Sequence, residues 1–190
     1  MRESKRAQIA HRISHCAQVL ADEHGLDGFT LEALAEAAGV SRRTLFNYFP
    51  SKIDAVLGTG PVPDPAVVAT FQAGGPHGVL LDDLGVMVTA VLEDKRIERE
   101  DAARIRRLMC QHPRLLAAAH DGMSKFGDMF AEAIVQRETG AVDATDARIL
   151  FRVVLSIFDT ALDDFIVSAD DRSLSELYAE HFGRLRALLA

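Results

Sequence analysis

The chain has 190 residues, of which 48% are apolar, and a formal net charge of −7. This length suits one or two small helical domains with a real hydrophobic core. No apolar run approaches the ~18 residues of a membrane-spanning helix, and the charged N-terminus lacks the apolar stretch of a signal peptide. We therefore expect a cytoplasmic protein with no membrane partner.

The first predicted helix covers residues 4–24, and Gly25 is placed to end it. Its apolar residues recur at helical spacing and form an inner stripe of Ile9, Ile13, Cys16, Ala17 and Leu20. His11 and His15 lie one turn apart, a spacing that can hold a metal. We favour plain surface histidines and expect no metal site. The two cysteines, Cys16 and Cys110, are interpreted as packed thiols, with a redox-sensing pair as the alternative.

Two short helical patterns follow between residues 29 and 49, separated by Gly39-Val40-Ser41. Thr30 and Ser41 are placed as N-caps, and Gly39 as the left-handed residue that ends the first helix. This is the spacing of a helix-turn-helix unit, whose second helix enters a DNA major groove. Leu45 with Tyr48 or Phe49 returns to the core. The opposite side then carries Arg42, Arg43, Thr44 and Asn47.

The segment 39–52, GVSRRTLFNYFPSK, resembles the signature of the tetracycline-repressor (TetR) family of bacterial transcriptional regulators. The resemblance covers roughly residues 5–57, and beyond them it is one of helical architecture alone. At Phe46 the family often has tyrosine. The resemblance implies an all-α fold with an N-terminal three-helix DNA-binding domain, residues 1–57. Residues 58–190 would then form a helical domain for effector binding and dimerisation.

The side chains on the exposed side of the second helix suit DNA recognition. Arginine bridges guanine O6 and N7 and asparagine pairs with adenine, so we expect Arg42, Arg43 and Asn47 to read bases. The resemblance implies that Thr44, Tyr48 and Lys52 contact phosphates and set the register. The alternative for Tyr48 is a core residue with its hydroxyl at the rim.

The charge distribution agrees with a DNA-binding N-terminal part. Residues 1–55 contain seven basic and seven acidic residues, so the other 14 basic and 21 acidic residues carry the whole −7. The basic residues of the first part cluster at its start and around the turn. A local basic surface on a neutral domain can contact phosphates, and we expect the acidic remainder to face away from DNA.

A fourth helix, capped by Ser51 with Asp54, is predicted to be short. The following segment 58–65 holds two glycines and three prolines and cannot continue a helix. In the resembled family this helix usually links the two domains and carries the ligand signal. We place the domain boundary near Gly58, with a short helix at 66–72 before the next break at 74–76.

Five later helices are predicted at 78–92, 99–111, 114–138, 144–168 and 174–189. Their apolar stripes are richer in Met and Phe than a minimal bundle needs. The resemblance implies that such side chains line an effector pocket, whereas the alternative is ordinary core. The candidate ligand-binding residues are Met109, Met123, Phe126, Phe130 and Phe158.

The last two helices have apolar residues on more than one face, for example Leu162 and Leu177. This pattern predicts a homodimer interface, and the alternative is burial inside a single chain.

No catalytic motif is present, neither a metalloprotease H-E-x-x-H, nor a hydrolase G-x-S-x-G, nor a phosphate-binding glycine loop. We predict no enzymatic activity and no cofactor. We predict a nucleoid-associated repressor that binds a palindromic double-stranded operator as a homodimer and is released by a small apolar or amphipathic effector. The alternative is a helical ligand-binding or scaffold protein without DNA binding.

Overall fold

The computed structural model describes residues 2–60, 63–95 and 97–189. Ten α-helices occupy these ranges and no strand occurs within them, which confirms the all-α prediction. The chain forms two compact units. The first unit combines Met1–Gly60 with Glu100–Gly122, and the second combines Pro61–Arg99 with Met123–Ala190.

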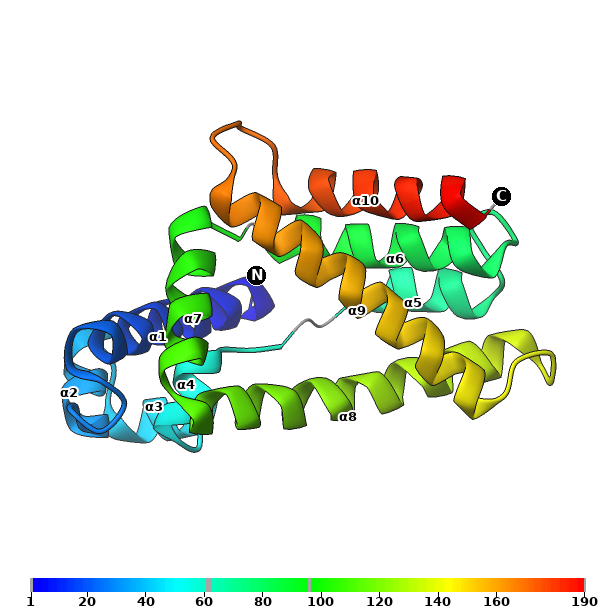
Figure 1. Cartoon of the computed structure of the whole chain (residues 1–190). Helices are drawn as coiled ribbons and strands as arrows, with labels where there is room; N and C mark the ends of the chain where they lie inside the picture. Colours follow the sequence, from blue (N-terminus) through cyan, green and yellow to red (C-terminus); the bar gives the residue numbers. More distant parts are fainter. Residues whose placement is uncertain (1, 61–62, 96, 190) are drawn as a thin grey trace. The chain divides into compact units, whose positions relative to one another are not determined.

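The first unit contains four consecutive helices, in which α1 packs against α2 and α4, and α2 packs against α3 (Figure 1). They are α1 (Arg2–His24), α2 (Leu31–Ala37), α3 (Arg42–Tyr48) and α4 (Lys52–Leu57). The unit also takes all but the first residue of α7 (Arg99–Gln111) and the first part of α8 (Pro113–Glu138).

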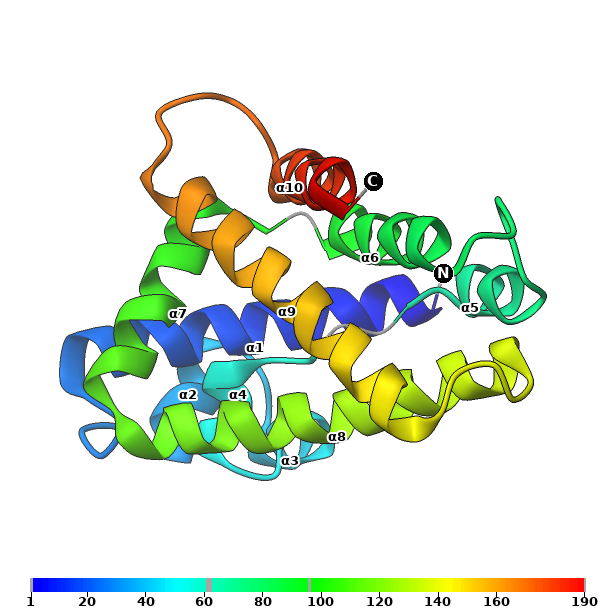
Figure 2. The same cartoon turned by 45° about the vertical axis from the view of Figure 1, so that its right-hand side comes forward.

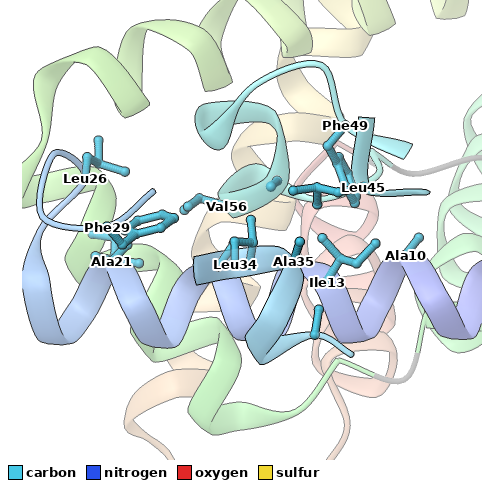
Figure 3. Close-up of a cluster of buried hydrophobic side chains, with 14 of the residues drawn as sticks. Ala10, Ile13, Ala21, Leu26, Phe29, Leu34, Ala35, Leu45, Phe49 and Val56 are labelled. Atoms are coloured by element: carbon cyan, nitrogen blue, oxygen red, sulfur yellow. The ribbon is translucent and has the colours of Figure 1, made fainter. Parts of the chain in front are cut away.

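The core of the first unit is built around α1. Ile13, Leu34 and Leu45 have no solvent exposure and bring α1, α2 and α3 together, with Phe49 and Val56 beside them (Figure 3). Burying each such side chain contributes roughly 1.5–3 kcal/mol. The buried Leu108 of α7 and Leu115 of α8 belong to the same core. The helix-turn-helix therefore packs on a core that includes side chains from α1 and from the distant segment Glu100–Gly122.

The second unit contains α5 (Pro65–Gln72), α6 (Leu80–Lys95), the rest of α8, α9 (Ala144–Val167) and α10 (Leu174–Leu189). In Figures 1 and 2, α10 runs alongside α6 and α9 lies next to α10. Its core is aromatic: the Phe130 and Phe151 ring centres are 5.3 Å apart, and the Phe126 and Phe151 ring centres are 6.0 Å apart. Gly127 permits this packing, because a Cβ there would lie 2.6 Å from a ring carbon of Phe151.

A buried ion pair joins the start of α6 to the end of α8. Arg137 donates through Nη2 to Asp83 Oδ2 at 2.5 Å, and both side chains are almost completely buried. Asp83 also accepts backbone N–H groups of His77 and Gly78 at 2.7 and 3.2 Å. Burial raises the pKa of Asp83, but the hydrogen bonds from Arg137 and His77 outweigh it and hold this pKa below its ordinary value.

The helix bounds agree with the predicted ranges within a few residues, since caps and breakers act locally. α4 is short, as predicted; of the predicted break at 58–65, residues 61 and 62 lie outside the described residues. The division into domains at residues 57 and 58 stays a prediction. The packing adds a feature that the sequence pattern did not indicate, namely that Glu100–Gly122 packs with the N-terminal helices.

Candidate DNA-binding surface

The turn between α2 and α3 is set by hydrogen bonds at both of its ends. Gly39 has a φ of +62°, the left-handed conformation that glycine adopts at low cost. Its N–H donates to Glu36 O at 3.0 Å, and the Val40 N–H donates to Ala35 O at 2.9 Å. This pair of bonds is the Schellman motif, which ends α2 and directs the chain into α3.

α3 is capped at its start and anchored along one face. Ser41 Oγ accepts the Thr44 N–H at 3.0 Å, so the predicted N-cap is confirmed, as is that of Thr30, whose Oγ1 accepts the Ala33 N–H at 3.1 Å. Leu45 is fully buried and Phe49 nearly so. The residues on the opposite side that are exposed are Arg42, Arg43, Phe46 and Asn47.

Two of these exposed side chains have partners within the unit. Arg42 donates through Nη1 to Glu32 Oε1 of α2 at 2.9 Å. The same guanidinium lies 5.5 Å from the centre of the Phe46 ring, a side chain that is 42% exposed. Exposed pairs of this kind are weak, so an incoming nucleic acid can displace them at little cost. Arg43 and Asn47 point from the same helix into solvent.

Thr44 and Tyr48 are only partly exposed. The Thr44 hydroxyl is 2.8 Å from Ser41 Oγ, at the start of the helix. The Arg6 guanidinium lies 5.7 Å from the centre of the Tyr48 ring. Arg6, which lies on α1, therefore adds a cation next to Tyr48, one of the predicted DNA-contacting residues of α3.

Lys52 is turned toward its own chain. Its Nζ donates to Leu26 O at 2.7 Å and to Phe29 O at 2.8 Å, and it lies 4.9 Å from the centre of the Phe29 ring. Both carbonyls belong to the turn between α1 and α2. An ammonium has three N–H donors, so one remains for a phosphate. Phosphate contact by Lys52 stays a prediction, and the side chain has a structural role that the sequence did not indicate.

The five candidate ligand-binding residues do not form one group. Met123, Phe126 and Phe130 lie together in the core of the second unit. Met109 packs instead on the core of the first unit. Phe158 is half-buried on α9 and lies outside both of these clusters. Of the five candidates, the three clustered residues are therefore the ones that lie close enough together to belong to one site.

α9 and α10 use some of their apolar residues inside the unit. Leu162 and Leu177, which the sequence offered as interface residues, are 9% and 1% exposed and belong to the fold. Other positions stay open, with Ile149 56% and Leu188 83% exposed. Ile149, Val153, Leu185 and Leu188 line a groove between the two helices with a volume of about 810 Å³.

Several contacts could not be predicted from the sequence, because no local pattern indicates them. Glu32 faces Arg42 from ten positions away, one helix earlier. His15 pairs with Asp101 of α7 at 3.2 Å, so a carboxylate does lie near the histidines of α1. Cys16 is half-buried and Cys110 is exposed, so the interpretation of two packed thiols was wrong for Cys110.

Comparison with known proteins shows to which family the chain belongs. Residues 15–55 match the family profile described as "Bacterial regulatory proteins, tetR family". Residues 82–190, more than half of the chain, match the profile described as "MftR C-terminal domain". The chain belongs to the TetR family. It is a TetR-family transcriptional regulator, and the first match contains the whole of the helix-turn-helix.

A solved structure shows the same fold. The TetR-family chain is similar to a crystal structure from Mesorhizobium loti, provisionally described as a TetR-family transcriptional regulator. The two are 18% identical, the TM-score is 0.56, and 96% of each chain is covered. A comparison with curated proteins gives no match. Among the described helices, none is long and apolar enough to span a bilayer.

Proposed function

We propose that this TetR-family regulator is a repressor that binds a palindromic operator as a homodimer and leaves it when a small apolar or amphipathic effector binds the second unit. The observation that carries the proposal is the division of α3 into two faces. Leu45 fixes one face in the core, while Arg42, Arg43 and Asn47 stand exposed on the other. A helix held in this way can enter a major groove without rearranging.

The residues have separate roles in the proposal. Arg42, Arg43 and Asn47 read base edges, and Thr44, Tyr48 and Lys52 contact the sugar-phosphate backbone. Arg42 must leave Glu32 to reach a base, since its Nη1 is held there at 2.9 Å in the free protein.

Fluorescence anisotropy with DNA from upstream of the protein's own gene tests this assignment. Each alanine replacement at Arg42, Arg43 or Asn47 should cost about 1–3 kcal/mol of binding and relax the preference at one operator position. Lys125→Ala is the control, because it also removes one exposed positive charge, but from α8 in the second unit. A folded triple variant that binds with wild-type affinity would refute the assignment and favour a ligand-binding or scaffold protein without DNA binding.

Effector release is supported by the aromatic cluster of the second unit, to which Met123, Phe126 and Phe130 contribute. Pockets for small molecules are lined mainly by such side chains. An effector releases the operator only if it binds the free state more tightly than the DNA-bound state. Thermal-shift screening against lipids, acyl-thioesters and aromatic compounds should find stabilising ligands. A ligand that stabilises the protein but leaves operator affinity unchanged would argue against release.

Dimerisation is supported by the groove between α9 and α10. Isolated exposed apolar residues are common, but Ile149, Val153, Leu185 and Leu188 gather in one groove, which suits a covered interface. A two-fold dimer also places two recognition helices in successive major grooves, about 34–36 Å apart.

A further inference from the structure

The exposed side of α3 carries an aromatic residue, Phe46, among its polar side chains. The Phe46 side chain is 42% exposed. Among residues 5–60, whose side chains the structure describes, it is the only large apolar side chain that is exposed. Phe46 follows Arg42 by one helical turn and precedes Asn47 directly, so it lies on the same side of α3 as the residues proposed to read bases.

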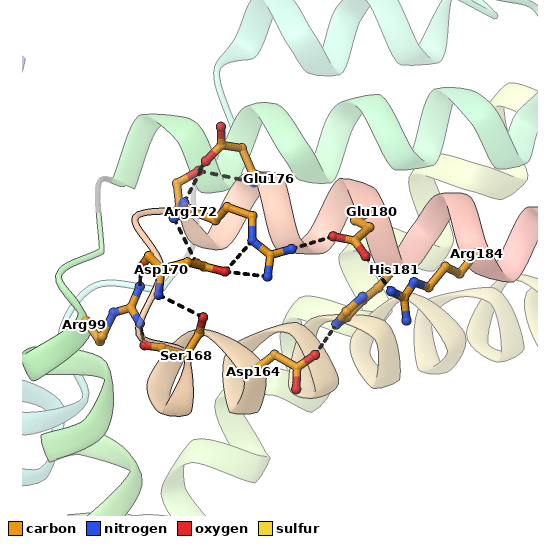
Figure 4. A network of polar contacts seen from close by, with 10 residues as sticks. Arg99, Asp164, Ser168, Asp170, Arg172, Glu176, Glu180, His181 and Arg184 are labelled. Atoms are coloured by element: carbon orange, nitrogen blue, oxygen red, sulfur yellow. Dashed lines mark hydrogen bonds and ion pairs between the residues drawn. The ribbon is translucent and has the colours of Figure 1, made fainter.

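The contact between Arg42 and Phe46 is unlike the other contacts of a cation with a phenylalanine ring. Three more such rings occur in the part of the chain that the structure describes, and all three are buried: Phe29, Phe71 and Phe165. Their cations are fixed as well. Arg99, over the last of these rings, donates to the backbone carbonyls of Ser168 and Asp170 (Figure 4). The Phe46 ring is instead exposed, under an arginine that only an exposed carboxylate holds, so it is available to a partner.

The major groove of DNA offers one apolar group to such a ring. The base edges there present hydrogen-bond donors and acceptors, and thymine alone adds a 5-methyl group. A phenyl ring pressed against a donor or an acceptor removes its water without replacing the hydrogen bond, which is unfavourable. Against a methyl group, the same ring buries apolar surface on both sides. A thymine is therefore the base that suits Phe46 best.

We propose that Phe46 recognises the 5-methyl group of a thymine in each half of the operator. The inference rests on the proposed binding of a palindromic operator. Four residues of an α-helix rise about 6 Å, and one base pair rises about 3.4 Å. The thymine therefore lies within about two base pairs of the base that Arg42 reads. Because the methyl group itself is recognised, a 5-methylcytosine at this position presents the same contact.

Removing the methyl group alone tests this role. The probe is the palindrome that the full-length protein selects from random DNA, with each thymine of the half-site replaced in turn by uracil in both halves. At one position the wild type should lose affinity about fourfold for each methyl group, or about fifteenfold for both, as measured by fluorescence anisotropy. Phe46→Ala should bind the thymine and uracil forms equally. At the same position, the wild type should prefer 5-methylcytosine to cytosine by about the same factor, and Phe46→Ala should not.

Leu116→Ala is the matched control, because it removes another large exposed apolar side chain of the first unit, but from α8. This variant should discriminate thymine from uracil as the wild type does. If the selected operator has no thymine, or if uracil is tolerated at every position, Phe46 does not read a methyl group, and base reading by its neighbours stands. A uracil effect that persists in Phe46→Ala would assign the methyl group to another residue. A wild type that prefers no sequence over unrelated DNA would overturn operator binding itself.

Discussion

At the scale of single residues, Lys52 has one observed role, in the structure, and one predicted role, in phosphate binding, and the two differ in their measurable consequences. Its bonds to Leu26 O and Phe29 O tie the start of α4 to the turn between α1 and α2. All three residues lie outside the helix-turn-helix sequence, so these bonds connect the segments that flank the motif on either side. The remaining N–H is the one that a DNA phosphate would use.

We predict that Lys52→Ala lowers the free energy of unfolding by about 1–3 kcal/mol, because two carbonyls lose a charged donor. It should also make the salt dependence of operator binding shallower by about one unit, since one phosphate contact is lost. Chemical denaturation and anisotropy at several salt concentrations measure the two effects. A destabilised variant with an unchanged salt slope would restrict Lys52 to positioning the turn.

At the scale of elements, the end of α2 depends on the backbone conformation of Gly39. An alanine there would meet no neighbouring atom, so space is not the constraint. The constraint is the φ of +62°, which disfavours a Cβ by roughly 1–2 kcal/mol.

We predict that Gly39→Ala destabilises the protein by that amount. Gly183→Ala is the matched control, because Gly183 lies inside α10 at a helical φ with open space around it. That change should stabilise the protein by about 0.5–1 kcal/mol. Urea unfolding of both variants gives the comparison, and shifts of equal sign would contradict the backbone argument.

The Asp83–Arg137 pair joins α6 to α8 and makes the free energy of unfolding depend on pH in the acidic range. The pKa of Asp83 is lowered from 3.8 in the folded state, so the folded protein binds this proton less readily than the unfolded chain. The stabilisation is therefore fully present above about pH 4 and is lost as the pH falls through the lowered value.

Asp83→Asn should lower stability at pH 7 by about 3 kcal/mol, since it removes the fully buried one of the two carboxylates that pair with Arg137 and leaves only the partly exposed Glu138. Because the wild type loses the same interaction in acid, the difference between the two proteins should shrink below about pH 4. Denaturation across this pH range measures it, with the exposed Glu132→Gln as control. A constant difference would show that Asp83 does not titrate as described.

At the scale of the whole molecule, dimerisation should respond to the open groove positions and not to the buried ones. We predict that Ile149→Glu yields a folded protein with weakened dimerisation, because the side chain is 56% exposed within one chain. Leu177→Glu, at 1% exposure, should lower the unfolding midpoint sharply, because it buries an unpaired charge in the core.

Analytical ultracentrifugation with circular dichroism distinguishes these outcomes. Operator binding on the same samples should show that Ile149→Glu loses cooperative binding to a full palindrome while keeping the helix content of the wild type. A variant at Ile149 that dimerises as tightly as the wild type would locate the interface elsewhere on the chain.

The sequence by itself determined the features that depend on neighbours within a few residues. The caps at Thr30, Ser41 and Ser51, and the left-handed Gly39, follow from side chains and backbone conformations three or four positions apart. The order of helices and the exposed side of α3 follow from the helical repeat, and the family resemblance rests on the same segment.

Only the tertiary structure decided which distant residues meet. Lys52 contacts residues 26 and 23 positions earlier, and Arg137 contacts Asp83 across 54 positions. Apolar periodicity, taken together with the family resemblance, gave Met109 and Phe130 the same interpretation, yet they pack in different units. It also could not separate the buried Leu177 from the open Ile149. A repeat pattern indicates that a side chain lies on an apolar face of a helix. Which surface covers that face, if any does within the chain, depends on how the chain closes its loops, and local spacing does not encode this.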